Sequence, residues 1–80
     1  MKNREYYERL FAEYPDVVTV TEFCAMLGGI CDKTARKLIR ENHIKHFYIG
    51  AAYLIPKEWV IEYVLSDHYA QYKKGLRVKV

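Results

Sequence analysis

The stretch "TVTEFCAMLGGICDKTARKLIREN", residues 19–42, carries start and stop signals for two short helices. Thr19 and Glu22 fit a capping box, in which a hydroxyl and a carboxylate satisfy free backbone amides at a helix start. The first helix is predicted to run to about Leu27, and the two glycines that follow favour the left-handed backbone with which helices often end. Its apolar stripe consists of Val20, Phe23, Cys24 and Leu27.

A second helix is predicted to begin after Cys31 and to end near Asn42. Asp32 stands where the positive end of the helix dipole favours an acidic side chain. Asparagine tolerates the left-handed geometry that ends a helix. Two short helices separated by about three or four residues form a helix-turn-helix.

The stretch "IKHFYIGAAYLIP" follows, with an apolar period close to two. Phe47 and Ile49 precede a glycine, and Tyr53 and Ile55 follow it, which predicts a β-hairpin with one face on the core. A helix-turn-helix followed by a hairpin is a winged helix. The predicted fold class is therefore mainly α with a small β-hairpin: a winged helix-turn-helix with an extra N-terminal helix and a C-terminal helix.

Helices are also predicted at both ends of the chain. The first runs from about Asn3 to Tyr14, because the residue before Pro15 is pushed out of the helical region. After the hairpin, Pro56 suits a first helical turn, and "KEWVIEYVLSDHYAQYKK" predicts one closing helix that extends toward Gly75. The last five residues, "LRVKV", alternate and predict either a short strand or a basic tail. The apolar face of the N-terminal helix consists of Tyr7, Leu10, Phe11 and Tyr14.

The length of the chain limits its organisation. Eighty residues, 51% of them hydrophobic, are enough for one domain and too few for two. We expect a single domain over residues 1–80, with an N-terminal helix at 1–15, a winged helix at 18–65, and a helix extension with a basic tail at 66–80. The predicted core consists of Val20, Phe23, Cys24, Leu27, Leu38, Ile39, Phe47, Ile55 and Val60.

Charge is unevenly distributed along the chain, although the net charge is only +3. Residues 1–22 carry three basic and five acidic side chains, whereas residues 31–50 carry five basic and two acidic ones. There is no run of about 18 apolar residues, and the N-terminal "MKNREYYERL" is charged, unlike a signal peptide. We therefore expect a cytoplasmic protein with no membrane partner.

The predicted second helix has one basic face and one apolar face. The basic face consists of Lys33, Arg36, Lys37 and Arg40, which are spaced as one side of a helix. A basic face is often only a solvated surface. Here it lies on the second helix of a helix-turn-helix, ahead of a hairpin, and this position favours contact with a polyanion. The apolar face is predicted from Ala35, Leu38, Ile39 and Asn42.

The segment from Val18 to Leu65 resembles the excisionase family of small winged-helix proteins, which are related to MerR-like DNA-binding domains. Its layout is similar to that of excisionases from conjugative transposons. The resemblance rests on the capped "TVTEFCAMLGG" helix, on "DKTARKLIREN" at the place of the recognition helix, and on "FYIGAAYLIPKEW" as wing and following helix. It implies sequence-selective binding of double-stranded DNA, with DNA bending beside a tyrosine integrase. Where such wings commonly carry arginine, this one carries Tyr48, Ala51 and Ala52.

The basic face can serve DNA binding in two ways. Lysine and arginine neutralise phosphates and release counterions, and either Arg36 or Arg40 can also fork onto O6 and N7 of guanine. Thr34 lies near the N-terminal end of the helix, where base edges are usually reached. Tyr48 on the wing and the lysines near the C-terminus can contact the backbone. The predicted DNA-binding residues are Lys33, Thr34, Arg36, Lys37, Arg40, Tyr48, Lys73 and Lys74.

Other chemistry is not predicted. The cysteines and histidines at 24, 31, 43 and 46 have spacings that do not match a zinc finger, so neither a metal nor another cofactor is expected. Cys24 and Cys31 both fall at partly or wholly interior helical positions, which favours reduced thiols. The sequence has no catalytic set of carboxylates, no phosphate loop and no Ser/His/Asp arrangement, so no enzyme is expected.

Two classes of function remain open. The first is a DNA-binding accessory protein of a mobile genetic element, which assists site-specific recombination by an integrase and can self-associate cooperatively on DNA. A small transcription regulator with the same module is its close relative. The second class is a protein-interaction winged helix that no longer binds DNA and whose basic face docks an acidic partner.

Overall fold

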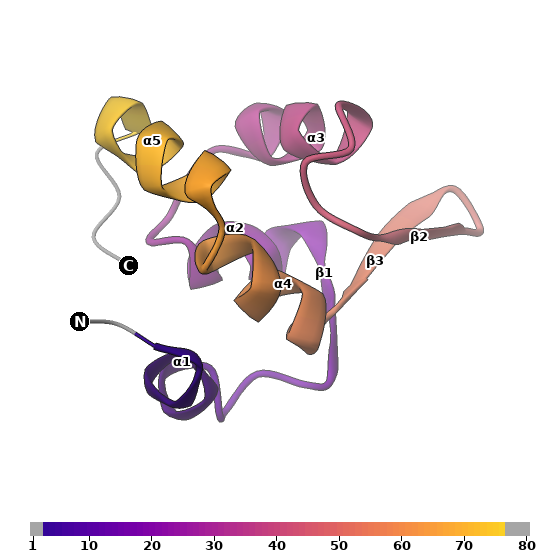
Figure 1. Ribbon diagram of the computed structural model, residues 1–80. Helices are drawn as coiled ribbons and strands as arrows, with labels where there is room; N and C mark the ends of the chain where they lie inside the picture. Colours follow the sequence, from indigo (N-terminus) through magenta and orange to yellow (C-terminus); the bar gives the residue numbers. More distant parts are fainter. Residues whose placement is uncertain (1–2, 77–80) are drawn as a thin grey trace.

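The computed structural model describes residues 3–76, with side chains described as far as residue 71 (Figure 1). Within these residues the chain is mostly helical and contains one small antiparallel sheet, which confirms the predicted winged helix-turn-helix class. The elements in order are α1 (Arg4–Leu10), β1 (Val17–Thr19), α2 (Val20–Met26), α3 (Asp32–Arg40), β2 (Phe47–Ile49), β3 (Ala52–Pro56), α4 (Lys57–Val64) and α5 (Asp67–Leu76).

The helix-turn-helix is formed by α2 and α3 through the local signals that the sequence contains. The Glu22 amide donates to the Thr19 hydroxyl oxygen at 3.3 Å, and the Thr19 amide donates to a Glu22 carboxylate oxygen at 3.0 Å, so the capping box is confirmed. Gly28 and Gly29 follow α2 with φ of 86° and 91°. Asn42, two residues after α3, has φ of 60°, the left-handed geometry expected at this end.

The sheet has three strands in the order β1-β3-β2. β3 pairs antiparallel with both neighbours, with Val18 opposite Ile55 and Tyr48 opposite Tyr53. The sequence predicted the β2–β3 hairpin and an extended stretch near Val18, but not that this stretch joins the sheet. Gly50 and Ala51 form the tight turn between β2 and β3, both with positive φ.

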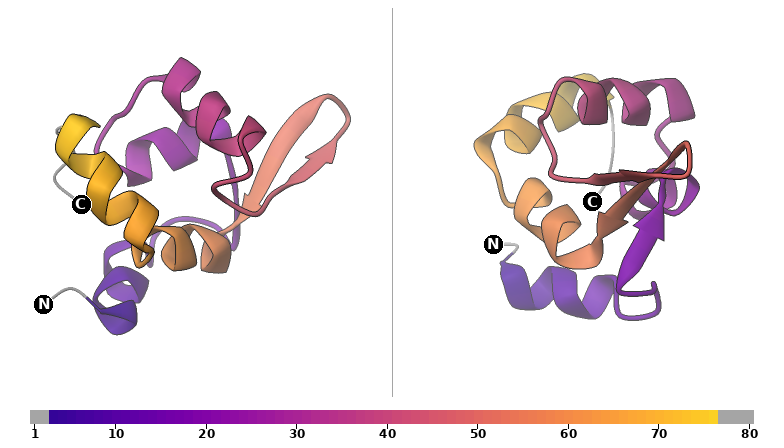
Figure 2. Two further views of the ribbon diagram at one scale, coloured as in Figure 1. Left: turned by 45° about the horizontal axis from the view of Figure 1, so that its top comes forward. Right: turned by 90° about the vertical axis from the view of Figure 1, so that its right-hand side faces the viewer.

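The expectation that the hairpin lays one face on the core is wrong for its first strand. Phe47 and Ile49 of β2 are 48% and 61% exposed, whereas Ile55 on β3 is fully buried. β1 and β3 lie against the helices. The outer half of the β2–β3 hairpin, which contains the turn, extends away from them (Figures 1 and 2). β2 is therefore an outer strand that projects from the body. We refer to residues 47–56 as the wing.

The core is formed by side chains from the helices and from the inner part of the sheet. Of the predicted core residues, Cys24 is only partly buried and Phe47 is exposed, while the other seven are buried. The core also contains residues that the list of predicted core residues left out, including one from α1, one directly after α1 and one from α5. The further buried residues are Tyr7, Phe11, Val18, Met26, Ala35, Ile44, Ile61, Tyr63, Val64 and Tyr69.

α1 is shorter than predicted. It ends at Leu10 rather than near Tyr14, because the chain forms turns from Phe11 onward. The helix therefore ends several residues before Pro15, which was expected to end it. On the predicted apolar face, Tyr7 and Phe11 are buried and Tyr14 is half-buried, but Leu10 is exposed. The Lys57 ammonium donates to the Tyr14 carbonyl at 3.0 Å and so ties the turn after α1 to the start of α4.

The sequence predicted one continuous closing helix, but the structure divides it into α4 and α5. The break falls at Leu65 and Ser66, where the Ser66 hydroxyl accepts a hydrogen bond from the Tyr69 amide at 3.3 Å and caps α5. The change of direction places the Tyr69 ring in the core. Leu76 is the last residue of α5, so it belongs to no strand; the rest of the predicted strand or tail lies outside the described residues. None of the helices described is both long and apolar enough to cross a membrane.

Candidate nucleic-acid interface

α3 presents one face to the core and the other to solvent, largely as its sequence predicts. Ala35, Leu38 and Ile39 are buried. Asn42, which was placed on the same apolar face, is exposed, because α3 ends at Arg40 and the backbone then turns left-handed. All four side chains of the basic face are exposed: Lys33, Arg36, Lys37 and Arg40.

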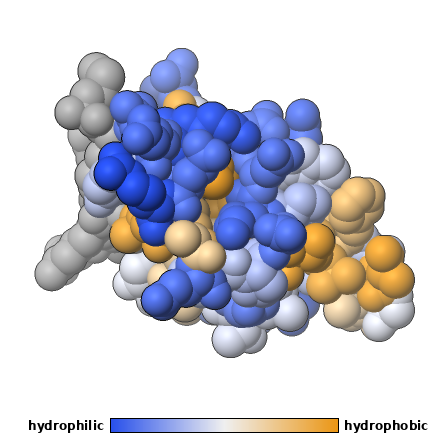
Figure 3. Space-filling model, turned by 90° about the horizontal axis from the view of Figure 1, so that it is seen from below, coloured by the Kyte–Doolittle hydropathy of each residue, from blue (hydrophilic) through white to orange (hydrophobic). Residues whose placement is uncertain are grey.

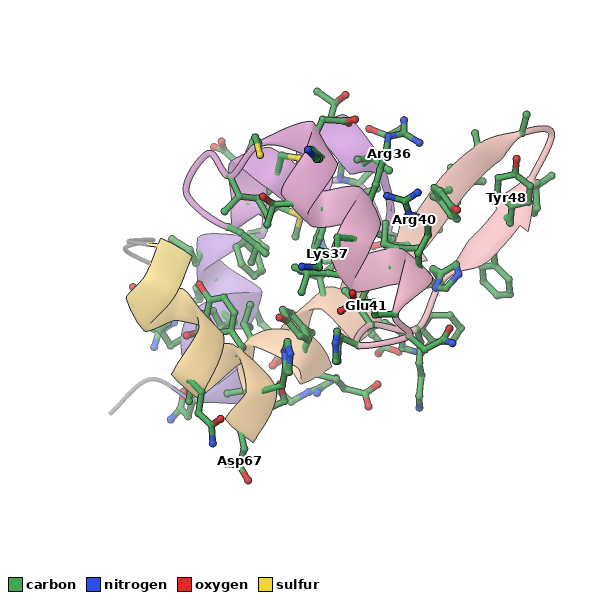
Figure 4. The ribbon with its side chains drawn as sticks, turned by 90° about the horizontal axis from the view of Figure 1, so that it is seen from above. Arg36, Lys37, Arg40, Glu41, Tyr48 and Asp67 are labelled. Atoms are coloured by element: carbon green, nitrogen blue, oxygen red, sulfur yellow. The ribbon has the colours of Figure 1, made fainter. Side chains whose placement is uncertain are left out.

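The basic side chains lie on two sides of the α3 axis (Figure 4). Arg36 and Arg40 lie on the side that faces the wing, and Lys37 lies on the opposite side. Together they cover the exposed surface of the helix rather than one narrow line. An anionic ligand that lies along α3 would therefore meet positive charge on both sides of the helix.

Arg36 is held by neighbours from two elements. Its Nε donates to Oδ2 of Asp32 at 2.7 Å, and its guanidinium carbon lies 5.9 Å from the centre of the Tyr53 ring on β3. The hydrogen bond and the negative charge of Asp32 raise the pKa of Arg36, so the side chain is always charged. Arg40 differs, because it forms no ion pair with any residue in the described part of the chain.

The start of α3 carries a thiol and a hydroxyl in contact. Sγ of Cys31 lies 3.0 Å from the hydroxyl oxygen of Thr34, a residue that is half-buried as a whole. Cys31 is exposed, which corrects its predicted interior position, because it precedes the first turn of α3 and lies outside the helical spacing. The hydrogen bond from Thr34 lowers the pKa of the Cys31 thiol, while burial raises that of the half-buried Cys24. Among the residues described, no three potential ligands are grouped closely enough to hold a metal ion.

The wing is apolar and bears no charged side chain over residues 47–56. Tyr48 is 62% exposed and lies out on the hairpin, away from α3 (Figure 4). Its ring contacts Tyr53 with centroids 4.9 Å apart, and the Phe47 ring contacts Trp59 at 5.2 Å. Hydrophobic surface gathers over this end of the molecule (Figure 3). A wing of this composition can offer phosphate contacts only through the hydroxyls of Tyr48 and of the half-buried Tyr53 and through backbone amides.

Lys73 and Lys74 lie within α5, but their side chains are outside the described part of the structure. α5 begins beside the end of α3, because the His43 and His68 rings stack there with centroids 3.8 Å apart and planes 16° apart. Nδ1 of His68 lies 3.0 Å from the Tyr63 hydroxyl, and Nε2 of His43 lies 3.2 Å from a Glu41 carboxylate oxygen. The stack therefore couples α5 to the loop that follows α3.

Stability should decrease in mild acid because of this stack. Burial, and then the charge of neighbouring His43, lower the pKa of His68 in the folded chain, and Glu41 opposes the shift. The unfolded chain therefore binds the proton first as the pH falls below about 6.5, which favours unfolding down to the lowered folded pKa. We expect the melting temperature to fall between about pH 7.5 and about pH 5.5. The His68→Asn variant should show a flatter profile, and an identical profile in this variant would contradict the assignment.

Two members of the interface were missed or undervalued by sequence reasoning. Tyr53 was assigned to packing, and no local signal shows that it reaches Arg36, since the two are brought together only by the fold. Asp32 was read as support for the helix. The spacing of four residues predicted that it supports the helix through a pair with Arg36, and the structure confirms the pair.

The comparison with protein families agrees with this geometry. The family model of the helix-turn-helix domain matches residues 17–67, which include the sheet, α2, α3 and α4. Comparisons with curated proteins and with solved structures find no match to this chain. The matched segment covers more than half of the 80 residues and contains the whole basic face of α3. The chain therefore belongs to the helix-turn-helix domain family, which supports DNA as its partner.

Proposed function

We propose that this protein is a non-catalytic DNA-binding accessory protein of a mobile genetic element, of the excisionase type, which binds duplex DNA through α3 and assists a tyrosine integrase. The observation that carries the proposal is the exposed pair Arg36 and Arg40 on the wing-facing side of α3, the second helix of a helix-turn-helix. A helix in this position enters the major groove, and its exposed arginines can reach bases and phosphates. Such a protein acts in the cytoplasm, where it meets DNA.

Each part of the interface has a distinct task in this proposal. Lys33 and Lys37, exposed on α3, contact phosphates on either side of the groove. The apolar wing lies along the sugar edges of the adjacent minor groove, where apolar side chains can open base steps and bend the duplex. Bending of this kind is what an accessory protein contributes beside an integrase. Lys73 and Lys74 on α5 add phosphate contacts, and neighbouring copies bind cooperatively.

The wing also favours a second candidate function. Exposed Phe47, Tyr48 and Ile49 form an uncharged surface of the kind that proteins bury against one another. A protein-interaction winged helix would use this surface and would dock an acidic partner on the basic face of α3. A transcription regulator would share the DNA contacts of the excisionase but act without an integrase.

Charge reversal on α3 tests the proposal. The double variant Arg36→Glu, Arg40→Glu should lose at least about 100-fold in affinity for duplex DNA, since an arginine contact to a base is worth about 1–3 kcal/mol and both reversed charges repel phosphates. Gel shifts at low salt against a pool of duplexes, including the region upstream of the gene, measure the loss. Circular dichroism and the melting temperature should stay nearly unchanged, because both side chains are exposed.

A matched control is available on α1. Arg4→Glu with Arg9→Glu changes the net charge by the same amount, on exposed residues of a helix at the opposite end of the molecule from α3 (Figure 1). This variant should lose much less affinity. If the wild-type chain retards no duplex, DNA binding is refuted and the protein-interaction function replaces it. If it binds DNA but leaves excision by the integrase of the same element unchanged, the regulator function replaces the excisionase.

A further inference from the structure

The two arginines on the wing side of α3 are held differently. Arg40 has no ion-pair partner among the described residues, so its long side chain keeps its freedom. Arg36 is engaged on its Nε by Asp32 and over its guanidinium by Tyr53. Ordering a long side chain before the ligand arrives lowers the entropic cost of binding and restricts the geometry it can offer. Arg36 is therefore preorganised and Arg40 is adaptable.

The contact that orders Arg36 leaves its recognition edge available. Oδ2 of Asp32 accepts a hydrogen bond from Nε, the guanidinium nitrogen nearest the helix, at 2.7 Å. Within the described part of the chain, the two terminal nitrogens, Nη1 and Nη2, form no hydrogen bond, so they can donate side by side. This end-on fork matches the two acceptors, O6 and N7, that guanine alone presents together in the major groove. A lysine cannot reproduce it, because its ammonium is a point charge rather than a planar fork.

Tyr53 supplies the second constraint from a different element. It lies on β3 of the wing. Its ring packs edge-on against His46, with centroids 5.5 Å apart, and at a tilt against Tyr48, with centroids 4.9 Å apart. The ring therefore has a defined place from which to contact the guanidinium. A cation over an aromatic ring is attracted to it, so Tyr53 limits the swing of Arg36 toward the wing.

Asp32 is an unfavourable residue for DNA binding in general. It is exposed on the surface that faces DNA in the proposed function, and its negative charge repels every phosphate. Asp32 repels all duplexes, but it also orients the side chain that reads one base. Such a residue increases discrimination between DNA sites and lowers the affinity for all of them. If Asp32 only supported the helix, it would not increase the discrimination between bases.

We infer that Arg36 reads one guanine in the target site and that Asp32 and Tyr53 are the positioning residues that give it this specificity. The inference rests on the proposed DNA binding and names the base that the site selects. Arg40, by contrast, serves the phosphate backbone and contributes affinity without selectivity.

The test uses the full chain and measures selectivity separately from affinity. Selection from random duplexes gives the wild-type site, and duplexes with each guanine of that site replaced in turn give the preference at each position. We expect one guanine position with a preference of about 5- to 150-fold, the range of a bidentate contact. Arg36→Lys should abolish the preference at this position alone. Arg40→Ala should keep it, while weakening specific and random duplexes equally and flattening the salt dependence.

Asp32→Ala is the decisive variant. It should reduce the guanine preference at the Arg36 position to less than about 3-fold, well under the range of an intact bidentate contact. It should at the same time bind random duplexes more tightly than wild type, because a repelling charge has gone. Asp32→Asn keeps an oxygen that can accept from Nε, so it should restore part of the preference while random binding stays tighter. Tyr53→Leu should weaken the preference without changing the salt dependence.

Four results would overturn the inference. Equal losses for specific and random duplexes in Asp32→Ala would assign Asp32 to helix support only. An unchanged guanine preference in Asp32→Ala and Asp32→Asn would remove its positioning role. A wild-type chain that binds no duplex would refute the proposed function and this inference together, whereas binding without any preference that depends on Arg36 would refute the inference alone.

Discussion

Replacing Leu38 with alanine is expected to lower the free energy of unfolding by about 2–5 kcal/mol. Leu38 lies on the buried face of α3, is 1% exposed, and belongs to the core at the place where α3 packs on α2. The substitution removes apolar contacts and leaves a cavity that the surrounding side chains fill only in part. The free energy of unfolding of a chain of 80 residues is only a few kcal/mol, so much of the Leu38→Ala population should be unfolded. Urea denaturation followed by circular dichroism measures the change.

Leu10→Ala is the matched control for this variant. Leu10 is also a helical leucine, but it is 45% exposed at the end of α1. A surface substitution of this kind usually changes stability by no more than about 0.5 kcal/mol. If Leu38→Ala unfolded at the same urea concentration as wild type, α3 could not be docked with Leu38 inward, and the assignment of its basic face to solvent would be wrong as well.

Replacing Phe11 with alanine should cost about 3–5 kcal/mol, although Phe11 lies outside the segment matched by the family model. Its ring is 1% exposed, lies against Tyr7 with centroids 5.8 Å apart, and meets Tyr14 edge-on at 6.2 Å. α1 packs on α4, so loss of this ring removes a large part of the packing that holds the N-terminal region to the rest of the core. Thermal and urea denaturation should show a single destabilised transition.

Phe47→Ala separates this result from the general effect of removing a phenyl ring. Phe47 is 48% exposed on β2, and its contact with Trp59 lies at the edge of the wing. We expect a loss of less than about 1 kcal/mol, since little of the ring's surface is removed from water. A large loss for Phe47→Ala with none for Phe11→Ala would restore the predicted core, which included Phe47 and listed no residue of the N-terminal helix.

The helix-turn-helix could be predicted because its signals are local. Thr19 and Glu22 bond to each other's backbone within one turn, and the glycines after α2 adopt positive φ where they stand. The spacing of Ala35, Leu38 and Ile39 determines which face of α3 is buried, and therefore which face is basic. None of these features depends on where the rest of the chain goes. The positions proposed to bind DNA on α3 follow from the same spacing.

The features that could not be predicted depend on contacts between residues far apart in the chain. Pairing of β1 with β3 requires a partner more than thirty residues away, so an extended stretch near Val18 could not be assigned to a sheet. Burial along the wing depends on how far the helices cover it, which leaves Phe47 in solvent despite a regular apolar alternation. Amino-acid order alone determined the capping box of α2, the turn after it and the two faces of α3. Only the tertiary structure placed Tyr53 against Arg36 and His68 against His43, because each pair joins elements whose relative position is set by packing.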